Sequence, residues 1–282
     1  MSNLAVGGAG ASSIGAAGLG GAMRLLPLLA QEYSRIMHAR VAIVIWVMMA
    51  YAVLMLPFAL AKPPEELVEA LAVWLGPANI QSKIVSFFWT DTTMNKFAMI
   101  LGPILAGGIM IDEKSRGMLE LLLAKPVRVA DYFMIKLGAA LLAMATFYLT
   151  ASAAAAITFP FRVPDFQIAP FVALTAVHFF SALFAITFSA MVAVLVRRKL
   201  ASVLISFLTL SVLVGFAFIG LYYPPLLEVS YLNPFTNGVM IITRFESFGT
   251  SDVVVPITVL LTMNAAVAVA GRALAPKVLS DE

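Results

Sequence analysis

One of the two histidines in the chain lies in an unusual place. His178 is in the middle of a long apolar segment, and Thr175 and Ser181 stand three residues to either side of it. Residues three apart share a face of an α-helix, so these side chains predict a polar strip on an apolar helix. An ionisable group inside a membrane-spanning helix indicates a functional site by default. The alternative is a neutral imidazole that hydrogen-bonds to a neighbouring helix.

The other reactive residues form no catalytic pattern. The chain has no cysteine, no H-E-x-x-H pair of histidines and no G-x-x-x-x-G-K-[ST] loop for nucleotide phosphates. We therefore expect no catalytic residue, no metal site and no cofactor bound by this chain. A serine hydrolase in the membrane would depend on His178 as its base. Basic and aromatic residues do not interleave in a patch, so nucleic acid is not an expected partner.

The composition is that of an all-α integral membrane protein. Apolar residues make up 62% of the chain and charged residues only 12%, and the mean hydropathy is +0.99. Soluble proteins carry about 25% charged residues, so a soluble fold of this chain would lack polar surface. The stretches between the apolar segments are too short to form a soluble domain.

Six apolar segments are long enough to cross a bilayer as helices, which takes about 17–25 residues. These predicted transmembrane helices are residues 41–61, 94–111, 132–159, 168–196, 200–222 and 253–270. Residues 23–40 mix apolar and charged side chains with a helical period, which predicts an interfacial elbow helix before the first span. The membrane domain is thus predicted over residues 23–275. Residues 1–22, rich in Gly and Ala, and residues 276–282 are predicted tails.

The second predicted span has two notable features. Lys96 stands near its outer end, from which a long side chain can reach the interface. Ala98, Gly102 and Ala106 follow at four-residue spacing, a pattern that lets another helix approach closely.

The basic residues predict the orientation. With both termini in the cytoplasm, six spans leave only five of the 18 Lys and Arg residues outside, namely Lys62, Lys83, Lys96, Arg162 and Arg244. Because cytoplasmic segments of membrane proteins carry the excess of Lys and Arg, this distribution favours cytoplasmic termini.

The densest cluster of charge lies in residues 112–126, DEKSRGMLELLLAKP. Each charge would cost at least about 2.5–3.5 kcal/mol in hydrocarbon, yet the leucines are too apolar for a solvated loop. A short helix at the membrane surface meets both conditions, with Gly117 allowing the bend into it and Pro126 ending it. The alternative is a generic amphipathic connector between two spans.

The pattern Asp112-Glu113-Lys114-x-x-Gly117-x-Leu119-Glu120-x-Leu122-x-x-x-Pro126 resembles the loop between the second and third spans of ABC type-2 transporter permeases. In that family the loop is a cytoplasmic coupling helix that docks in a cleft of the ATP-binding subunit. ATP and Mg are then bound by that partner. The resemblance implies an ATPase-docking set of Glu113, Lys114, Arg116, Gly117, Leu119, Glu120, Leu122 and Leu123.

Residues 230–238, SYLNPFTNG, resemble a second part of the same family. There, short re-entrant helices before the last span are proposed to close the pathway on the non-cytoplasmic side. Non-helical backbone at membrane depth needs hydrogen-bond partners, which Asn233, Thr236 and Asn237 can supply. The alternative is an ordinary external loop with two turns. The candidate pathway or gate residues are His178, Asn233, Pro234, Phe235 and Asn237.

The resemblance implies a permease subunit, favouring export, in a bacterial or archaeal cytoplasmic (inner) membrane. The expected partners are an ATP-binding subunit, a second copy or a similar permease, and membrane lipid. Residues 65–93, which mix acidic and aromatic side chains, are a candidate contact for a periplasmic partner. The alternatives are a non-transporting membrane scaffold or assembly protein and a secondary carrier, although the spans lack the buried carboxylates that ion-coupled carriers use. A lipid, a peptide and a drug all remain open as substrates.

Overall fold

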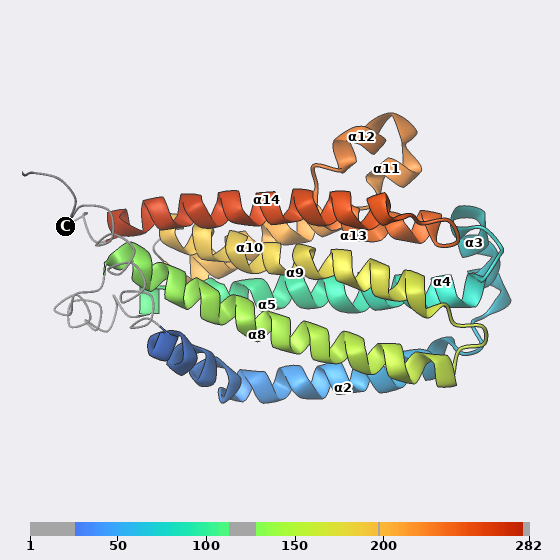
Figure 1. The fold of residues 1–282 in the computed structure, drawn as a ribbon, viewed down its shortest axis with the longest axis horizontal. Coiled ribbons are helices and arrows are strands. Elements are labelled where there is room, and N and C mark those ends of the chain that lie inside the picture. The colour runs from blue at the N-terminus through green and yellow to red at the C-terminus, as the bar shows by residue number, and fades with distance from the viewer. Residues whose placement is uncertain (1–25, 113–127, 197, 279–282) are drawn as a thin grey trace, which may run out of the picture.

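A computed structural model describes residues 26–112, 128–196 and 198–278, and these residues form helices and turns without a strand. The helices lie side by side in one elongated bundle (Figure 1). Among the described residues four helices are long and apolar enough to cross a membrane, which confirms four of the predicted spans. They are α2 (Arg40–Leu60), α8 (Val129–Thr158), α9 (Ile168–Val196) and α14 (Thr250–Leu274).

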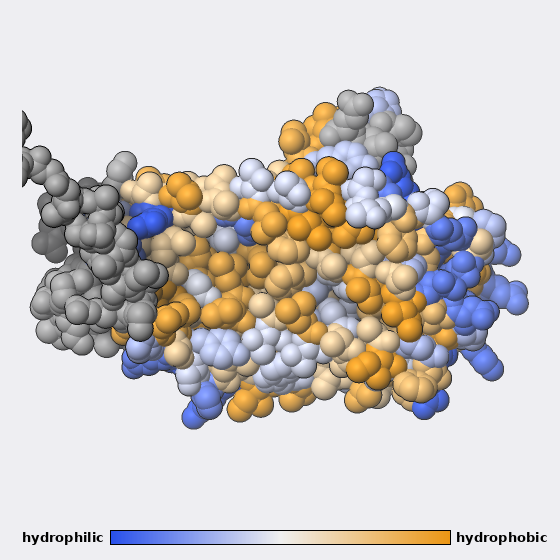
Figure 2. All heavy atoms as spheres, viewed as in Figure 1, coloured by the Kyte–Doolittle hydropathy of each residue, from blue (hydrophilic) through white to orange (hydrophobic). Residues whose placement is uncertain are grey.

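The outer surface of the bundle is apolar along its length. Large apolar side chains on α2 point outward, among them Ile43, Val47 and Phe58. Figure 2 shows apolar residues along the side of the bundle and hydrophilic residues gathered at the end where α3 (Glu65–Leu75) lies. An apolar surface this extensive is avoided in soluble proteins, and the four long helices match the thickness of a bilayer. The architecture is compatible with a membrane location.

The centre of the bundle is α9. It contacts α5 (Lys96–Ala106), α8, α10 (Lys199–Gly215) and α14, and it is the most buried of the four long helices. The last helix, α14, is the most exposed of the four. A polar contact holds α14 to α9, because the Asn264 amide donates to the Phe180 carbonyl oxygen at 3.1 Å and accepts from the Thr187 hydroxyl at 3.0 Å.

The predicted second span, residues 94–111, is not among these four helices, and its first residues continue a helical run that begins earlier. Three segments follow one another without a break: α4 (Ile80–Phe87), the π-helix η1 (Phe88–Asn95) and α5. Lys96 is therefore well inside a continuous helical run and not near the outer end of a span, and this prediction was wrong.

Burial of Lys83 explains why the run can start so early. Its ammonium lies 2.8 Å from the Glu246 carboxylate and donates to the Leu75 carbonyl oxygen at 2.7 Å, although the side chain is almost completely buried. An ion pair with further hydrogen bonds compensates for much of the cost of removing a charge from water. A sequence-based hydropathy analysis assigned Lys83 to a loop because its partner lies far away in the sequence.

The predicted fifth span, residues 200–222, is divided. Helix α10 ends at Gly215, and after a break at residues 216–218 the short α11 (Ile219–Tyr222) follows. The chain then forms η3 (Pro224–Leu226) and α12 (Leu227–Ser230), which with α11 project from the side of the bundle (Figure 1). It returns through α13 (Pro234–Met240) and η4 (Ile241–Arg244) to reach α14.

The small residues of α5 are used inside the chain. Ala98 and Ala106 are buried, and a Cβ added to Gly102 would lie 2.7 Å from the carbonyl oxygen of Ala185 on α9. The predicted close approach of another helix thus takes place between α5 and α9. This face is not available to a second copy of the chain.

The ends of the chain agree in part with the predicted domain limits. A helix covers residues 26–37, within the segment predicted as an amphipathic elbow. The Tyr33 hydroxyl lies 2.9 Å from the Thr146 hydroxyl of α8. The 3₁₀-helix η5 (Ala275–Val278) occupies the start of the predicted C-terminal tail. The predicted tail at 1–22 and nearly all of the predicted coupling segment lie outside the described residues.

We expect Gly102→Ala to destabilise the bundle, because the new methyl group must displace the Ala185 backbone. Overpacking of this kind costs about 1–3 kcal/mol. The measurement is the fraction of detergent-solubilised protein that stays monodisperse after heating. The matched control is Gly215→Ala, where nothing lies within 4 Å of the added Cβ. Equal thermal stability of the two variants would contradict the α5–α9 packing.

Candidate functional site

The middle of the bundle holds a buried polar network centred on His178. Its Nε2 lies 2.6 Å from the Asn95 side-chain oxygen, and its Nδ1 lies 2.9 Å from the Tyr148 hydroxyl. The imidazole has no exposed surface. Because Asn95 ends η1 and Tyr148 is on α8, one side chain of α9 joins three parts of the bundle.

The bonding pattern fits a neutral imidazole. The Asn95 oxygen can only accept, so Nε2 carries the proton and Nδ1 accepts from the Tyr148 hydroxyl. The Asn95 amide nitrogen in turn donates to the Asp91 carboxylate at 3.3 Å. The Tyr148 hydroxyl also donates to the Thr175 carbonyl oxygen at 3.1 Å, so its one proton is shared between that oxygen and Nδ1. A chain of hydrogen bonds therefore runs from Asp91 on η1 through α9 to α8.

The predicted polar strip of α9 is entirely buried, and each of its residues has a different role. The Thr175 hydroxyl donates to the Phe171 carbonyl oxygen of its own helix at 2.9 Å. The Ser181 hydroxyl donates to the Pro234 carbonyl oxygen at 2.6 Å, and so holds the start of α13 against α9. The strip thus contributes one bond within α9 and contacts to three other segments.

The segment around Pro234 also packs directly on His178. A Cβ added to Gly238 would lie 3.1 Å from the His178 Cα and Cδ2 atoms, so a larger residue would require His178 to shift by a few tenths of an ångström. Phe235 is completely buried beside it. The structure therefore brings together the candidate pathway residues. His178 lies beside the segment with Asn233, Pro234, Phe235 and Asn237, which is more than fifty positions later in the sequence.

Side chains of this segment satisfy the backbone that the end of α10 leaves open. A helix end has four carbonyl oxygens without an intrahelical donor. Asn233 donates to the Leu213 carbonyl oxygen at 2.6 Å, and Thr236 donates to that of Ala217 at 2.8 Å. Asn237 donates to the Tyr231 carbonyl oxygen at 3.0 Å. The break in α10 and the 233–237 segment therefore depend on each other.

The segment from α4 to η1 adds further polar groups to the interior. The side-chain polar atoms of Ser86 on α4 and of Trp89 and Thr90 on η1 are buried without a hydrogen-bond partner in the described part of the chain. Buried polar atoms of this kind are usually satisfied by ordered water, and π-helical turns are frequent at functional sites. The interior around η1 is thus suited to hold water.

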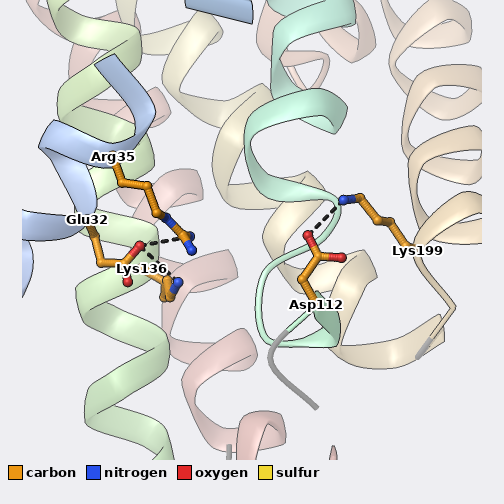
Figure 3. A network of polar contacts seen from close by, with 5 residues as sticks. All are labelled: Glu32, Arg35, Asp112, Lys136 and Lys199. Carbon is orange, nitrogen blue, oxygen red and sulfur yellow. Dashed lines mark hydrogen bonds and ion pairs between the residues drawn. The ribbon is translucent and has the colours of Figure 1, made fainter. Parts of the chain in front are cut away.

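A second polar cluster lies at the end of the bundle near residues 26–37, which we call the terminal end (Figure 3). The Glu32 carboxylate is 2.8 Å from the Arg35 guanidinium and 2.9 Å from the Lys136 ammonium of α8. Lys199, the first residue of α10, is 2.7 Å from Asp112. Asp112 follows α5 and Lys136 is on the helix after the coupling segment, so both sides of that segment are tied to other helices.

The predicted docking residues themselves cannot be placed. Glu113, Lys114, Arg116, Gly117 and the following residues of the set (Leu119, Glu120, Leu122 and Leu123) all lie outside the described residues. Only Asp112, the first residue of the predicted coupling segment, is described.

The geometry at His178 does not form a nucleophile–base pair. Both ring nitrogens are bonded to Asn95 and Tyr148, while the Ser181 hydroxyl is directed to the Pro234 carbonyl oxygen. In residues 26–112, 128–196 and 198–278, no group of three or more His, Asp or Glu side chains is arranged to hold a metal ion. The arrangement joins α9 to η1, α8 and α13.

Sequence analysis missed two members of this site. Asn95 lies at the start of a predicted span, where a polar residue is ordinary, and Tyr148 is one of several aromatic residues in the third predicted span. Helical periodicity does not identify which residues face each other across helices. The only signal available was that Asn95 and Tyr148 are polar groups in apolar surroundings.

In the described part of the chain, the fold and the site define a helical protein with four helices long and apolar enough to cross a membrane and a buried polar network around His178. Neither protein-family models nor curated proteins give a match to this chain. The resemblance of residues 112–126 and 230–238 to ABC type-2 permeases therefore enters only as a proposal.

We expect Asn95→Ala and His178→Ala to be coupled. Either change leaves a buried polar group unpaired, whereas the double variant removes both partners. Hydrogen bonds between membrane helices have coupling energies of about 0.6 kcal/mol on average and up to about 1.7 kcal/mol. The free energies of unfolding of the wild type, the two single variants and the double variant, measured in mixed detergent and SDS micelles, form a double-mutant cycle. In the control cycle, Thr262→Ala on the exposed face of α14 takes the place of Asn95→Ala. Additive effects of Asn95→Ala and His178→Ala would contradict the bond.

Proposed function

We propose that this protein is the transmembrane permease subunit of an ATP-driven ABC transporter that exports its substrate. The observation that carries the proposal is the coupling pattern of residues 112–126, placed between segments that are anchored to other helices. Asp112 is held to α10 by Lys199, and Lys136 holds α8 to residues 26–37 through Glu32. A force applied to the coupling segment by an ATPase would reach α5, α8 and α10 through these contacts.

The proposed topology has six spans with both termini in the cytoplasm of a bacterium or archaeon. The helical run from Ile80 to Ala106 is about 40 Å long and α10 about 25 Å, which supports two crossings in addition to those of the four long helices. Residues 26–37 would lie in the cytoplasmic interface as an elbow helix. The concentration of Arg and Lys at the terminal end supports this orientation.

In the proposed cycle, α13 and the chain before it close the pathway on the outer side. The bonds that hold this segment to α9 and α10 include Ser181 to the Pro234 carbonyl and Asn233 to the Leu213 carbonyl. Since α9 and α10 carry the other halves of these bonds, a tilt of either helix would strain them and release the segment. Two copies, or this chain and a similar one, would enclose the pathway, and hydrolysis of ATP would take place in the partner subunit.

The first test is the charge reversal Glu120→Arg. A tagged chain purified from its native membrane should bring down a nucleotide-binding subunit, and Glu120→Arg should lose most of it, because the reversed charge faces the docking cleft. Glu69→Arg, the same change on the exposed face of α3, is the matched control and should retain the subunit.

The outcomes separate the candidate functions. If the unmodified chain brings down no ATPase, the permease assignment fails and the scaffold or carrier takes its place. If both variants retain the ATPase, the transporter stands and the docking residues are wrong.

The six-span topology is tested by single cysteines, because the chain has none of its own. A membrane-impermeant maleimide added to intact cells should label Lys62→Cys and Ser247→Cys but not Arg128→Cys or Arg198→Cys; all four sites are exposed. Equal labelling of Lys62→Cys and Arg128→Cys would show that the run from Ile80 to Ala106 does not cross. Equal labelling of Arg198→Cys and Ser247→Cys would show the same of α10.

A further inference from the structure

A groove runs along the outside of the bundle between α2 and the segment formed by η1 and α5. Its volume is about 590 Å³, and it is lined by α2 from Val41 to Ala52 and by residues from Thr92 to Ile104. Ligand sites for small molecules typically have volumes of about 300–1,000 Å³. The groove is thus large enough for an elongated molecule.

The polar residues of the groove are gathered at one end. Tyr51, Thr92, Thr93 and Lys96 lie there, and Tyr51 has 67% of its surface exposed. The remainder of the lining, towards the terminal end, is apolar. The groove therefore has the polarity of an amphiphile, with one polar end and a long apolar body.

The polar end is at mid-depth in the bundle. Asn95, the neighbour of Lys96, is bonded to His178, which is ten residues from the start of α9, or about 15 Å at 1.5 Å per residue. Tyr51 likewise lies near the middle of α2. Half of a hydrocarbon layer is also about 15 Å thick. A face directed to lipid would not carry an exposed lysine at this depth.

The ammonium of Lys96 has no carboxylate within ion-pair distance in the described part of the chain. Asp91 attracts it electrostatically from further away, and one oxygen of that carboxylate already accepts from Asn95. The charge is thus best complemented by an anion that enters the groove. Thr92 and Thr93 add hydroxyl groups beside it.

We infer that the groove binds an anionic amphiphile, with its single apolar chain between α2 and α5 and its headgroup at Lys96. The inference rests on the proposed function in one respect, since it makes this molecule the class of substrate that is exported. The headgroup of the bound amphiphile lies closer to the outer side than its apolar chain does, as in a lipid of the outer leaflet. The groove therefore holds the headgroup midway along an outward path.

Native mass spectrometry of the full chain in detergent tests the inference. The two probes are 1-palmitoyl lysophosphatidate and 1-palmitoylglycerol, which share the acyl chain and differ in charge. The anionic probe should bind about tenfold more tightly, the effect expected of one charge-assisted contact. Lys96→Gln should remove this preference and Lys96→Arg should keep it. Lys62→Gln, an exposed lysine away from the groove, should leave it unchanged.

A further variant locates the apolar chain. Ile100→Trp should weaken the binding of both probes, because the indole fills the groove. An unchanged elution volume in size-exclusion chromatography would show that the variant is folded. Equal binding of the two probes, or a preference that survives Lys96→Gln, would overturn the inference. Efficient disulfide formation between two copies of Met48→Cys would overturn it too, since a second copy would then cover the groove.

These measurements use the chain without an ATPase, so a negative result would contradict the amphiphile site without contradicting the transporter assignment. Selective binding of the anionic probe, without any ATPase partner in the native membrane, would support the amphiphile site and contradict the exporter assignment. An ATPase partner without selective binding of the anionic probe would support the transporter assignment and contradict an anionic amphiphile as its substrate.

Discussion

Polar groups buried in the middle of this bundle require hydrogen-bond partners, which the apolar side chains around them do not supply. The hydrogen bonds of His178 meet this requirement in the middle of α9, where the imidazole is completely buried. Asn95 can end the π-helix at its position because the imidazole donates to it, and Tyr148 is fixed on α8 by the other ring nitrogen. This one side chain therefore links η1, α8 and α9 in addition to their apolar packing.

The same requirement accounts for the break in α10. Its last carbonyl oxygens are open, and Asn233 and Thr236 supply the missing donors from a segment that also contacts α9 through Ser181. The interruption is therefore stabilised by the seating of this segment, and the proposed gate requires that the segment can also be released. At the terminal end, the Asp112–Lys199 ion pair connects one side of the predicted coupling segment to α10, and the Lys136–Glu32 ion pair connects the other side to the helix at residues 26–37.

Much of the fold follows from the sequence, because apolar segments of more than twenty residues have few alternatives to a transmembrane helix. The limits of α2, α8 and α9 differ little from the predicted spans. The prediction fails where a charge is neutralised by a residue far away in the sequence. Lys83 made residues before 94 look like a loop, whereas Glu246 and the Leu75 carbonyl allow the helix to begin at Ile80.

The candidate site was predictable in part for a related reason. A histidine in an apolar segment and an Asn-Pro-rich segment stand out by composition, so His178 and residues 233–237 were found separately. Their contact was not predictable, because it depends on the close approach of Gly238 to His178. Lys96 was assigned to an outer interface, and only the helix that precedes it shows that it lies at mid-depth.

We propose that ATP changes the exposure of the polar surface of α9 that α13 and the chain before it cover. The measurement uses native membranes containing the chain with Ser181→Cys as its one thiol, since Ser181 is buried and donates to the Pro234 carbonyl oxygen. A membrane-impermeant maleimide is applied from the outer side with and without ATP and vanadate. Trapping the nucleotide should raise the rate of labelling, because the outer segment is released and water reaches residue 181. A rate that is the same with and without nucleotide would contradict it.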